Sequence, residues 1–445
     1  MNKKYGLATA IAMVVGIVIG SGVFFKAEKV LIETGGDLKL GIIAWIIGGL
    51  IMVTCAYVFS VLATKFEFVN GVVDYAEHTV GKKYAYYLGW FMAMIYYPSL
   101  VGVLAWVSAR YFCVILGYSI VGSEAFVISF VFMISSFALN VLSPKLTGKI
   151  QVSTTIIKLI PLYAMGIFGL IAGINNGLTI ENFTTVVNPV GNNLHALFTA
   201  VVATAFAYDG WIVATSINTE LKDSKKNLPI ALSIGSLIIV ATYVLFYVGL
   251  SGGISNELLM ESGEHGPLLA FTNIFSSAGA SFLYAFIVIS CLGTLNGLMI
   301  ACTRGIYSLS ARKQGPFPNI FNQIDKETNI PTNSGVLGLL LSALWLAFFF
   351  GANLAPVNWF GIFEFDSSEL PIITLYSLYI PIFIMVMVKF KELSIIKRYI
   401  MPFLAILGCI FMIIATIYSH QMGVFYYLIL FGVIMFIGFF SRKNN

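Results

Sequence analysis

Long apolar runs separated by short polar loops constrain the fold of this chain more than any other feature. Each predicted run has roughly 18 or more residues, which is the length of helix that crosses a bilayer. Only 10% of the residues are charged, against about 25% in soluble domains, so composition excludes an ordinary globular protein. Only helices satisfy the backbone of single apolar runs in lipid, so we predict an all-α membrane protein with twelve transmembrane helices. The predicted runs span residues 7–32, 40–63, 84–116, 125–143, 150–174, 194–218, 229–253, 279–310, 335–352, 370–388, 399–418 and 422–441.

Basic residues predict how the runs are oriented. Most of the 25 Lys and Arg fall in loops on the side of the N-terminus, whereas the opposite side has only Lys26, Lys29 and Lys39. Cytoplasmic loops carry the excess of basic residues, so we expect a multi-pass protein of the plasma or inner cell membrane with both termini in the cytoplasm. The net charge of +5 is spread over short loops, so we expect lipid rather than nucleic acid as a partner.

Motifs for catalysis or metal binding are absent from the sequence. There is no H-E-x-x-H, no Walker-type glycine-rich loop and no paired metal-ligand spacing. We therefore predict no catalytic residues, no metal and no cofactor, and we do not expect an enzyme. The Cys residues lie singly inside apolar runs and are interpreted as buried, inert thiols. They are Cys55, Cys113, Cys291, Cys302 and Cys409.

The first apolar run contains an unusual cluster of small residues. Gly16, Gly20, Ser21 and Gly22 lie near its middle, and each interior Gly destabilises a helix by up to about 1 kcal/mol. Two interpretations are open on this run alone. The small residues favour close helix packing, of the G-x-x-x-G kind, or they mark a break in the helix.

The sixth run favours the second interpretation. Asp209 and Gly210 lie near the middle of this run, and an Asp at mid-membrane costs roughly 2.5 to 3.5 kcal/mol unless it has a polar role. Capping the N-terminus of a half-helix is such a role, and we expect Ser21 to cap in the same way in run one. Runs one and six are five apart, and broken helices in corresponding positions indicate a transporter built from inverted repeats.

The two breaks predict a binding site for a zwitterion. The second half of run one begins with free amides and a positive dipole end, which suits a carboxylate. The first half of run one and the outer half of run six end in free carbonyls, which suit an ammonium group. An α-amino acid satisfies both kinds of end. The predicted substrate-binding residues are Ile17, Ile19, Gly20, Ser21, Gly22, Val23, Phe206, Ala207, Asp209 and Gly210.

Combined, these motifs resemble the amino acid–polyamine–organocation superfamily. The resemblance rests on GIVIGSGVF at 16–24, FAYDGW at 206–211, the Glu220-Leu-Lys motif and the Ser290-x-x-Gly-x-x-Asn motif. Within the superfamily the sequence is most similar to the L-amino-acid transporter family and its bacterial alanine/serine/cysteine-type and serine/threonine-type exchangers. The likeness runs through roughly residues 5 to 320.

The resemblance implies a leucine-transporter-like fold in a single transmembrane domain, residues 1–445. Two inverted five-helix repeats are expected at about 5–174 and 194–388, with two peripheral helices at about 399–441. Phe206 resembles the aromatic residue that gates the site from outside. Animal members resemble light chains joined to a heavy subunit by a Cys between helices three and four, but the loop at 117–124 has none. We therefore expect no disulfide-linked subunit.

Lys158 is the other informative residue, because it lies inside the fifth apolar run. A snorkelling lysine is one interpretation, since its charge lies roughly 12 Å from the cytoplasmic end of the run. The resemblance supports a second one, in which Lys158 occupies the sodium position of sodium-coupled relatives. There its ammonium would bond carbonyls near Gly16 and the hydroxyl of Ser290. A proton-carrying role for this lysine also stays open.

The sequence therefore predicts a secondary transporter of small neutral L-amino acids, of the alanine, serine, threonine and cysteine type. Alternating access and sodium-independent exchange are expected. A proton-coupled symporter is the alternative within the same class, and a channel or an intramembrane enzyme is the alternative outside it.

Overall fold

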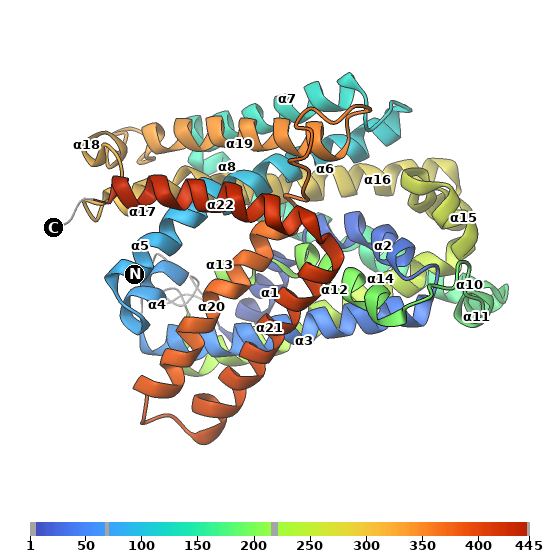
Figure 1. Ribbon diagram of the computed structural model, residues 1–445. Coiled ribbons are helices and arrows are strands. Elements are labelled where there is room, and N and C mark those ends of the chain that lie inside the picture. Colours follow the sequence, from blue (N-terminus) through green and yellow to red (C-terminus); the bar gives the residue numbers. More distant parts are fainter. Residues whose placement is uncertain (1–5, 67–70, 215–220, 443–445) are drawn as a thin grey trace. The chain divides into compact units, whose positions relative to one another are not determined.

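The computed structural model describes residues 6–66, 71–214 and 221–442, which form helices joined by short turns and loops (Figure 1). The main helices of the first half of the chain are α1 (Leu7–Val18), α2 (Gly22–Glu33), α3 (Leu38–Lys65), α4 (Val72–Thr79), α5 (Lys82–Phe91), η1 (Met92–Tyr96), α6 (Tyr97–Leu116), α7 (Ser123–Leu142), α8 (Pro144–Ile157), α9 (Leu159–Ala164), η2 (Met165–Gly169), α10 (Leu170–Asn175), α11 (Leu178–Thr184), α12 (Asn193–Tyr208) and α13 (Trp211–Ala214). Those of the second half are α14 (Ser224–Gly253), α15 (Asn256–Glu261), η4 (Gly263–His265), α16 (Gly266–Thr303), α17 (Gly305–Ser310), α18 (Pro318–Phe321), α19 (Thr332–Asn353), α20 (Leu370–Lys389), η5 (Ile396–Ile400), α21 (Met401–His420) and α22 (Met422–Ser441).

Nine helical segments in the described ranges are long and apolar enough to cross a membrane. A tenth is possible if the pair Leu159–Asn175 and Leu178–Thr184, bent by 88°, forms one span. The prediction of an all-α, multi-pass membrane protein is confirmed at this level. The nine segments are Leu38–Lys65, Lys82–Leu116, Ser123–Leu142, Ser224–Gly253, Gly266–Ser310, Thr332–Asn353, Leu370–Lys389, Ile396–His420 and Met422–Ser441.

Three of the predicted runs lack a single long helix, and two of them are the runs with predicted breaks. Run 7–32 is divided into α1 and α2, and run 194–218 into α12 and α13, with its last residues outside the described ranges. Both helix breaks are therefore confirmed. Run 150–174 is divided among α8, α9, η2 and α10. The number of transmembrane segments stays a prediction, because each half of a broken helix is shorter than a membrane-spanning helix even if the two halves together span the bilayer.

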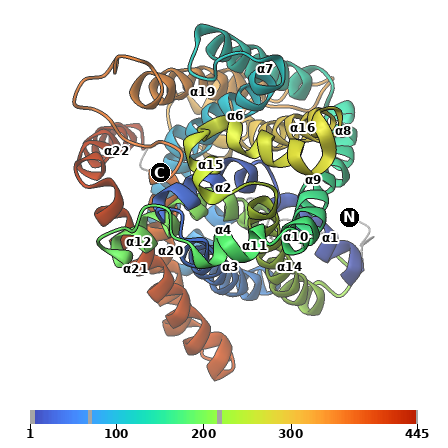
Figure 2. The same cartoon turned by 90° about the vertical axis from the view of Figure 1, so that its right-hand side faces the viewer.

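The described helices divide into two compact units. Unit 1 comprises residues 1–71, 155–287 and 379–419, and unit 2 comprises residues 72–154, 288–378 and 420–445. In unit 1, α3 and α14 lie side by side, and in unit 2, α19 lies along α6 (Figures 1 and 2). The helix α16 continues from one unit into the other and has a break at Ser276, where φ is 64°.

Aromatic side chains from different helices form the core of unit 1. The ring of Trp45 lies 5.7 Å from that of Tyr208 and 5.5 Å from that of Tyr243, measured between centroids. The hydroxyl of Tyr208 donates to the Trp45 carbonyl at 2.8 Å, so the polar tip of this buried ring is satisfied. This cluster fixes α3, α12 and α14 against one another. All five Cys are buried and free, as predicted.

Candidate substrate site

The first predicted break separates α1 from α2 in unit 1. Helix α1 ends at Val18, because Ile19 leaves the helical region with a ψ of 110°. Helix α2 begins at Gly22, and Ser21 occupies its N-cap position. Ile19, Gly20 and Ser21 are buried, so the break lies inside the protein rather than at its surface.

The second predicted break separates α12 from α13. Helix α12 ends at Tyr208, and Asp209 takes up an extended conformation with a ψ of 166°. Gly210 has a φ of 90°, a left-handed conformation that only glycine adopts without strain. The Asp-Gly pair therefore ends the helix in the middle of an apolar run, as the sequence indicated. Glu220, part of the motif that follows, lies outside the described residues.

The two breaks meet inside unit 1. A Cβ atom added to Gly22 would lie 2.5 Å from the Cα of Ala207, so the start of α2 and the end of α12 are in backbone contact. Any larger side chain at position 22 would push the two helices apart. The rings of Phe25 and Phe206 make an edge-to-face contact one turn away, with centroids 5.6 Å apart. Run one and run six therefore contribute to a single site.

Tyr243, on α14, connects the two carbonyl ends. Its hydroxyl lies 3.0 Å from the carbonyl oxygen of Ala207 and 3.3 Å from that of Val18. A hydroxyl has a single proton, and each carbonyl oxygen has two acceptor positions. The two carbonyl ends therefore keep acceptor capacity that Tyr243 does not use.

Sequence reasoning missed Tyr243. The chain has 22 Tyr, and nothing in the apolar run 229–253 distinguishes this one. The sequence analysis used Lys26 only as a basic residue on the side opposite the N-terminus, whereas the structure places it fully buried on α2. The Nζ atom of Lys26 lies 5.4 Å from the ring centroid of Phe206. A charged residue four positions after the cluster of small residues was the available signal.

The predicted capping role of Ser21 is wrong. An N-cap serine bonds the next amides from an extended backbone conformation, but Ser21 has φ −75° and ψ −17°, in the helical region. Its hydroxyl makes no capping bond and is buried without a hydrogen-bond partner among the described residues. The amides of Gly22 and Val23 have no acceptor within their own helix, because they belong to its first turn. The start of α2 therefore presents donors that the helix itself does not satisfy.

Lys158 lies between α8 and α9, and its side chain is only 4% exposed. Its ammonium group donates a hydrogen bond to the carbonyl oxygen of Gly16, which confirms the predicted contact with run one. This contact places a cation in the last turn of α1, where carbonyl groups are not satisfied within the helix. The snorkelling interpretation does not account for a charge held on a buried backbone carbonyl.

Ser290 belongs to unit 2, so the predicted bond between its hydroxyl and Lys158 would join the two units and stays a prediction. The Ser290 hydroxyl is itself buried and has no hydrogen-bond partner among the described residues. Across the described ranges, no group of three or more His, Cys, Asp or Glu side chains is arranged to hold a metal ion.

Comparison with known proteins agrees with the resemblance deduced from the motifs. The pattern of the amino acid permease family matches residues 5–440. The serine/threonine exchanger SteT of Bacillus subtilis is 28% identical over 454 aligned positions, covering 100% of this chain and 98% of SteT. The b(0,+)-type amino acid transporter 1 of Mus musculus is 23% identical, with 100% and 89% covered. The aspartate-proton symporter of Bacillus subtilis is 24% identical, with 77% and 67% covered.

The contact of Tyr243 with both carbonyl ends predicts a loss of stability in Tyr243→Phe. Each buried group left without its partner costs about 1 to 3 kcal/mol, so the thermal midpoint in detergent should fall by at least about 2 °C. Tyr247→Phe is the matched control on the same helix, because its buried hydroxyl bonds no backbone carbonyl among the described residues. Equal shifts in the two variants, measured by fluorescence-detected thermal unfolding, would contradict a specific role for Tyr243.

Proposed function

The chain belongs to the amino acid permease family, and we propose that it exchanges small neutral L-amino acids across the membrane without sodium. The substrates are of the alanine, serine, threonine and cysteine type. The observation that carries this proposal is the meeting of α1, α2 and α12, where Tyr243 bonds the carbonyls of Val18 and Ala207. A site with unsatisfied carbonyls on one side and unsatisfied amides on the other matches the two charged groups of an amino acid.

The ammonium group of the substrate is proposed to bind the carbonyl ends of α1 and α12. These ends carry the negative pole of each helix dipole, and their oxygens have acceptor positions that Tyr243 leaves unused. An ammonium group has three N–H donors, so it can bond the carbonyl oxygens of Val18 and Ala207 and the hydroxyl oxygen of Tyr243 at the same time. The predicted contacts with Ile17, Ile19 and Phe206 belong to this half of the site.

The carboxylate group is proposed to bind the start of α2. The amides of Gly22 and Val23 and the hydroxyl of Ser21 are donors without partners in the helix, and the positive dipole end faces the same point. Gly20 and Gly210 leave room for the backbone to approach the ligand, and Asp209 ends α12 beside it. The substrate side chain then lies against Phe206, which is 8% exposed and is proposed to close the site from outside.

The proposed architecture is the leucine-transporter-like fold, with repeats at about 5–174 and 194–388 and peripheral helices at about 399–441. The division into units supports it, because each unit takes corresponding helices from both repeats: α3 and α14 belong to unit 1, and α7 and α19 to unit 2. Inverted repeats produce alternating access by moving one set of helices against another. We place both termini in the cytoplasm and the protein in the cell membrane, on the distribution of basic residues.

Sodium independence is proposed on the position of Lys158. Its ammonium donates to the Gly16 carbonyl. The lysine side chain would then take the position in which this carbonyl would otherwise coordinate a bound sodium ion. The relative SteT is a serine/threonine exchanger, which supports exchange as the mode of transport. The alternative is proton-coupled symport, favoured by the relative that is an aspartate-proton symporter and by the buried, ionisable Lys158.

Exchange without sodium is tested in proteoliposomes that contain the purified chain. Vesicles loaded with L-serine should take up labelled L-serine at the same rate when choline replaces external sodium. Empty vesicles should take up little, because an exchanger returns to the other face only with substrate bound. A tenfold loss without sodium, or uptake into empty vesicles driven by an inward proton gradient, would contradict the proposal.

The proposed site binds the ammonium group at the carbonyl ends of α1 and α12 and the carboxylate group at the start of α2. We therefore predict that a substrate needs both charged groups to bind. Ethanolamine, which is serine without its carboxylate, leaves the donors at α2 unpaired and should compete about 5- to 150-fold more weakly than L-serine. Inhibition of labelled serine uptake measures this difference. Equal inhibition by the two compounds would rule out the proposed carboxylate pole.

Ser21→Ala gives a second test of that pole. Its hydroxyl has no partner in the described structure, so its removal should leave the thermal midpoint unchanged while raising the KM for L-serine. Ser236→Ala is the control, because Ser236 is another buried, unpartnered hydroxyl of unit 1 that lies on α14. A similar change of KM in both variants would show that the effect is not specific to the start of α2.

The contact between Lys158 and Gly16 predicts a defect in turnover rather than in binding. Lys158→Ala should lower the exchange rate at least about tenfold, with a smaller change in KM, because the lost contact is with the Gly16 carbonyl and not with the substrate. Ile160→Ala, two residues on and on an exposed face, is the control. If Lys158 is a fixed cation, exchange should stay nearly flat between about pH 5 and 8. A steep pH dependence that Lys158→Ala abolishes would identify a proton carrier instead.

A further inference from the structure

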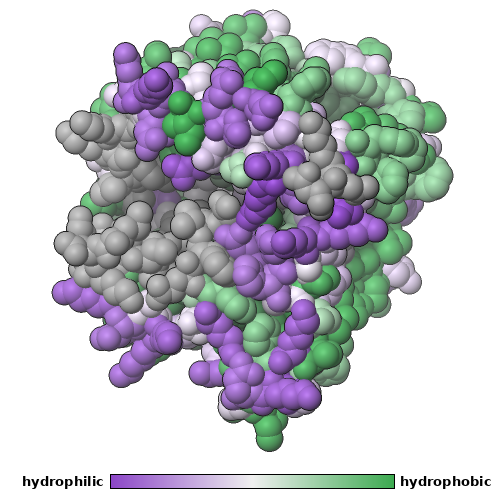
Figure 3. Space-filling model, turned by 90° about the vertical axis from the view of Figure 1, so that its left-hand side faces the viewer, coloured by the Kyte–Doolittle hydropathy of each residue, from purple (hydrophilic) through white to green (hydrophobic). Residues whose placement is uncertain are grey.

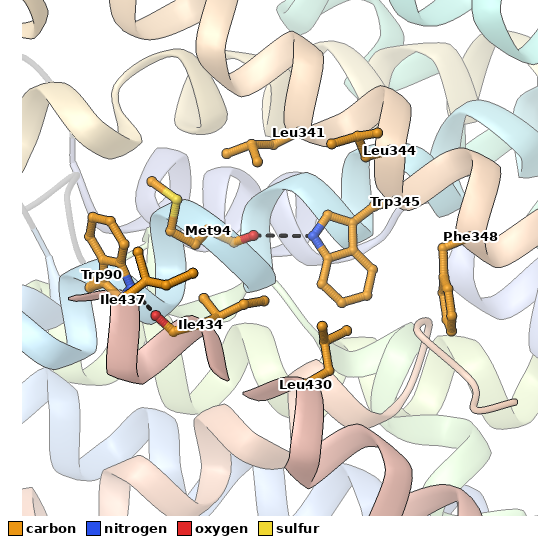
Figure 4. Close-up of a pocket in the computed structure, with 9 residues that line it drawn as sticks. All are labelled: Trp90, Met94, Leu341, Leu344, Trp345, Phe348, Leu430, Ile434 and Ile437. Carbon is orange, nitrogen blue, oxygen red and sulfur yellow. Dashed lines mark hydrogen bonds between the residues drawn. The ribbon is translucent and has the colours of Figure 1, made fainter. Parts of the chain in front are cut away.

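Unit 2 contains an apolar cavity of about 370 Å³ between three helices (Figure 4). This volume is more than twice the roughly 150 Å³ of an apolar cavity that stays dry and binds benzene. Trp90 from α5 and Met94 from η1 form one wall, and side chains of α19 and α22 form the others. The residues around it are Trp90, Met94, Leu341, Leu344, Trp345, Phe348, Leu430, Ile434 and Ile437.

The cavity offers no hydrogen bond from its side chains. Its two indole groups are already used: Trp90 donates to the Ile434 carbonyl at 2.9 Å, and Trp345 donates to the Met94 carbonyl at 3.1 Å. The other seven side chains that line it are aliphatic, thioether or phenyl groups. An occupant with polar groups would leave them unsatisfied, so a hydrocarbon fits this cavity best.

The cavity opens toward lipid along α22. Leu344 on α19 is 68% exposed and Ile437 on α22 is 52% exposed, although both line the cavity. Their neighbours Val433 and Phe436 are also more than half exposed and apolar. In a membrane-spanning helix such side chains face acyl chains, so a lipid chain reaches the cavity without crossing a polar barrier.

Basic side chains lie at one end of the cavity. Helices α5 and α22 run antiparallel, because Tyr86 bonds the Gly438 carbonyl and Trp90 bonds the Ile434 carbonyl. The same register, continued by one turn, places Lys82 at the start of α5 beside Arg442 after the end of α22.

Lys83 adds a second basic side chain at the start of α5. It lies seven residues, or about 10 Å, before Trp90 on the same face of the helix. Lys82 and Lys83 are exposed, and among the described residues no ion pair is recorded for these two or for Arg442. Figure 3, which views the side on which α22 ends in Figure 1, shows hydrophilic side chains gathered on this face.

We propose that unit 2 binds an anionic phospholipid, with one acyl chain in the cavity and the phosphate at Lys82, Lys83 and Arg442. The apolar lining selects a hydrocarbon chain, and the three cations, which form no ion pair within the described residues, select a negative headgroup. Because the cations lie at the end predicted to be cytoplasmic, the lipid belongs to the inner leaflet. The site is separate from the proposed substrate site, whose residues belong to unit 1.

Native mass spectrometry of the purified full-length chain tests this proposal. Delipidated protein is mixed with equal amounts of phosphatidylglycerol and phosphatidylcholine that carry the same acyl chains. Each basic side chain near a headgroup favours an anionic lipid by about fivefold, so we expect at least about a tenfold excess of bound phosphatidylglycerol. Equal binding of the two lipids would overturn the proposal.

Substitutions separate the headgroup from the chain. Lys82→Gln/Lys83→Gln/Arg442→Gln should bring the two lipids to nearly equal binding, whereas the control Lys222→Gln/Lys225→Gln/Lys226→Gln, at exposed lysines of unit 1, should keep the preference. Leu341→Trp and Ile437→Trp place a larger ring in the cavity and should reduce binding of both lipids at an unchanged thermal midpoint. If Leu341→Trp does not fold, Ile437→Trp still tests the position of the acyl chain, and the Lys82→Gln/Lys83→Gln/Arg442→Gln variant still tests the position of the headgroup.

Two further outcomes would overturn the proposal. The first is lipid binding that neither filling variant reduces, because the chain would then lie elsewhere. The second is a dimer of the chain that both filling variants abolish, because a second copy would then occupy the cavity.

Discussion

The hydroxyl of Tyr243 lies between the carbonyl ends that the breaks in α1 and α12 leave open. A break in a helix inside a bilayer exposes backbone groups that lipid does not satisfy, and each such group costs several kcal/mol. In unit 1, side chains from other helices form hydrogen bonds with these exposed backbone groups. The Tyr243 hydroxyl bonds the carbonyls of Val18 and Ala207, and the Lys158 ammonium bonds the carbonyl of Gly16, two residues before Val18. The breaks persist because neighbouring helices replace part of the lost hydrogen bonding.

In the proposed substrate site, this incomplete replacement of hydrogen bonds is what would allow a ligand to bind. A fully satisfied break would be a structural kink without affinity for a ligand. Here the carbonyls keep unused acceptor positions, and the Ser21 hydroxyl is buried without a partner among the described residues. An amino acid supplies both a donor group and an acceptor group of opposite charge, so its binding completes the hydrogen bonding of both ends. Affinity for the zwitterion and stabilisation of the broken helices are then the same interaction.

The sequence predicted those features that have local causes. Apolar runs give helices, and the small residues at 20–22 together with Asp209 and Gly210 end them where they do. The role of Ser21 was predicted wrongly, because the backbone angles at a cap depend on how the two half-helices join. Tyr243 was missed for a related reason, since its role follows from the packing of α14 and not from its neighbours in the chain. The contact of Lys158 with Gly16 was predicted only through the resemblance to a family.

The position of Tyr243 depends in turn on close packing along α14. Glycines of α14 are in backbone contact with glycines of η2 and α10, as at Gly249 with Gly166 and at Gly252 with Gly173. On the opposite side, Gly41 of α3 accommodates the ring of Tyr247. Small residues let helices in a membrane approach closely, so α14 has little freedom to shift. A hydroxyl that must reach two carbonyls at 3.0 and 3.3 Å needs such a support, because a movement of 1 Å would break either bond. The glycines of η2 and α10 therefore support the proposed substrate site from a distance, because they hold the helix that carries Tyr243 in place.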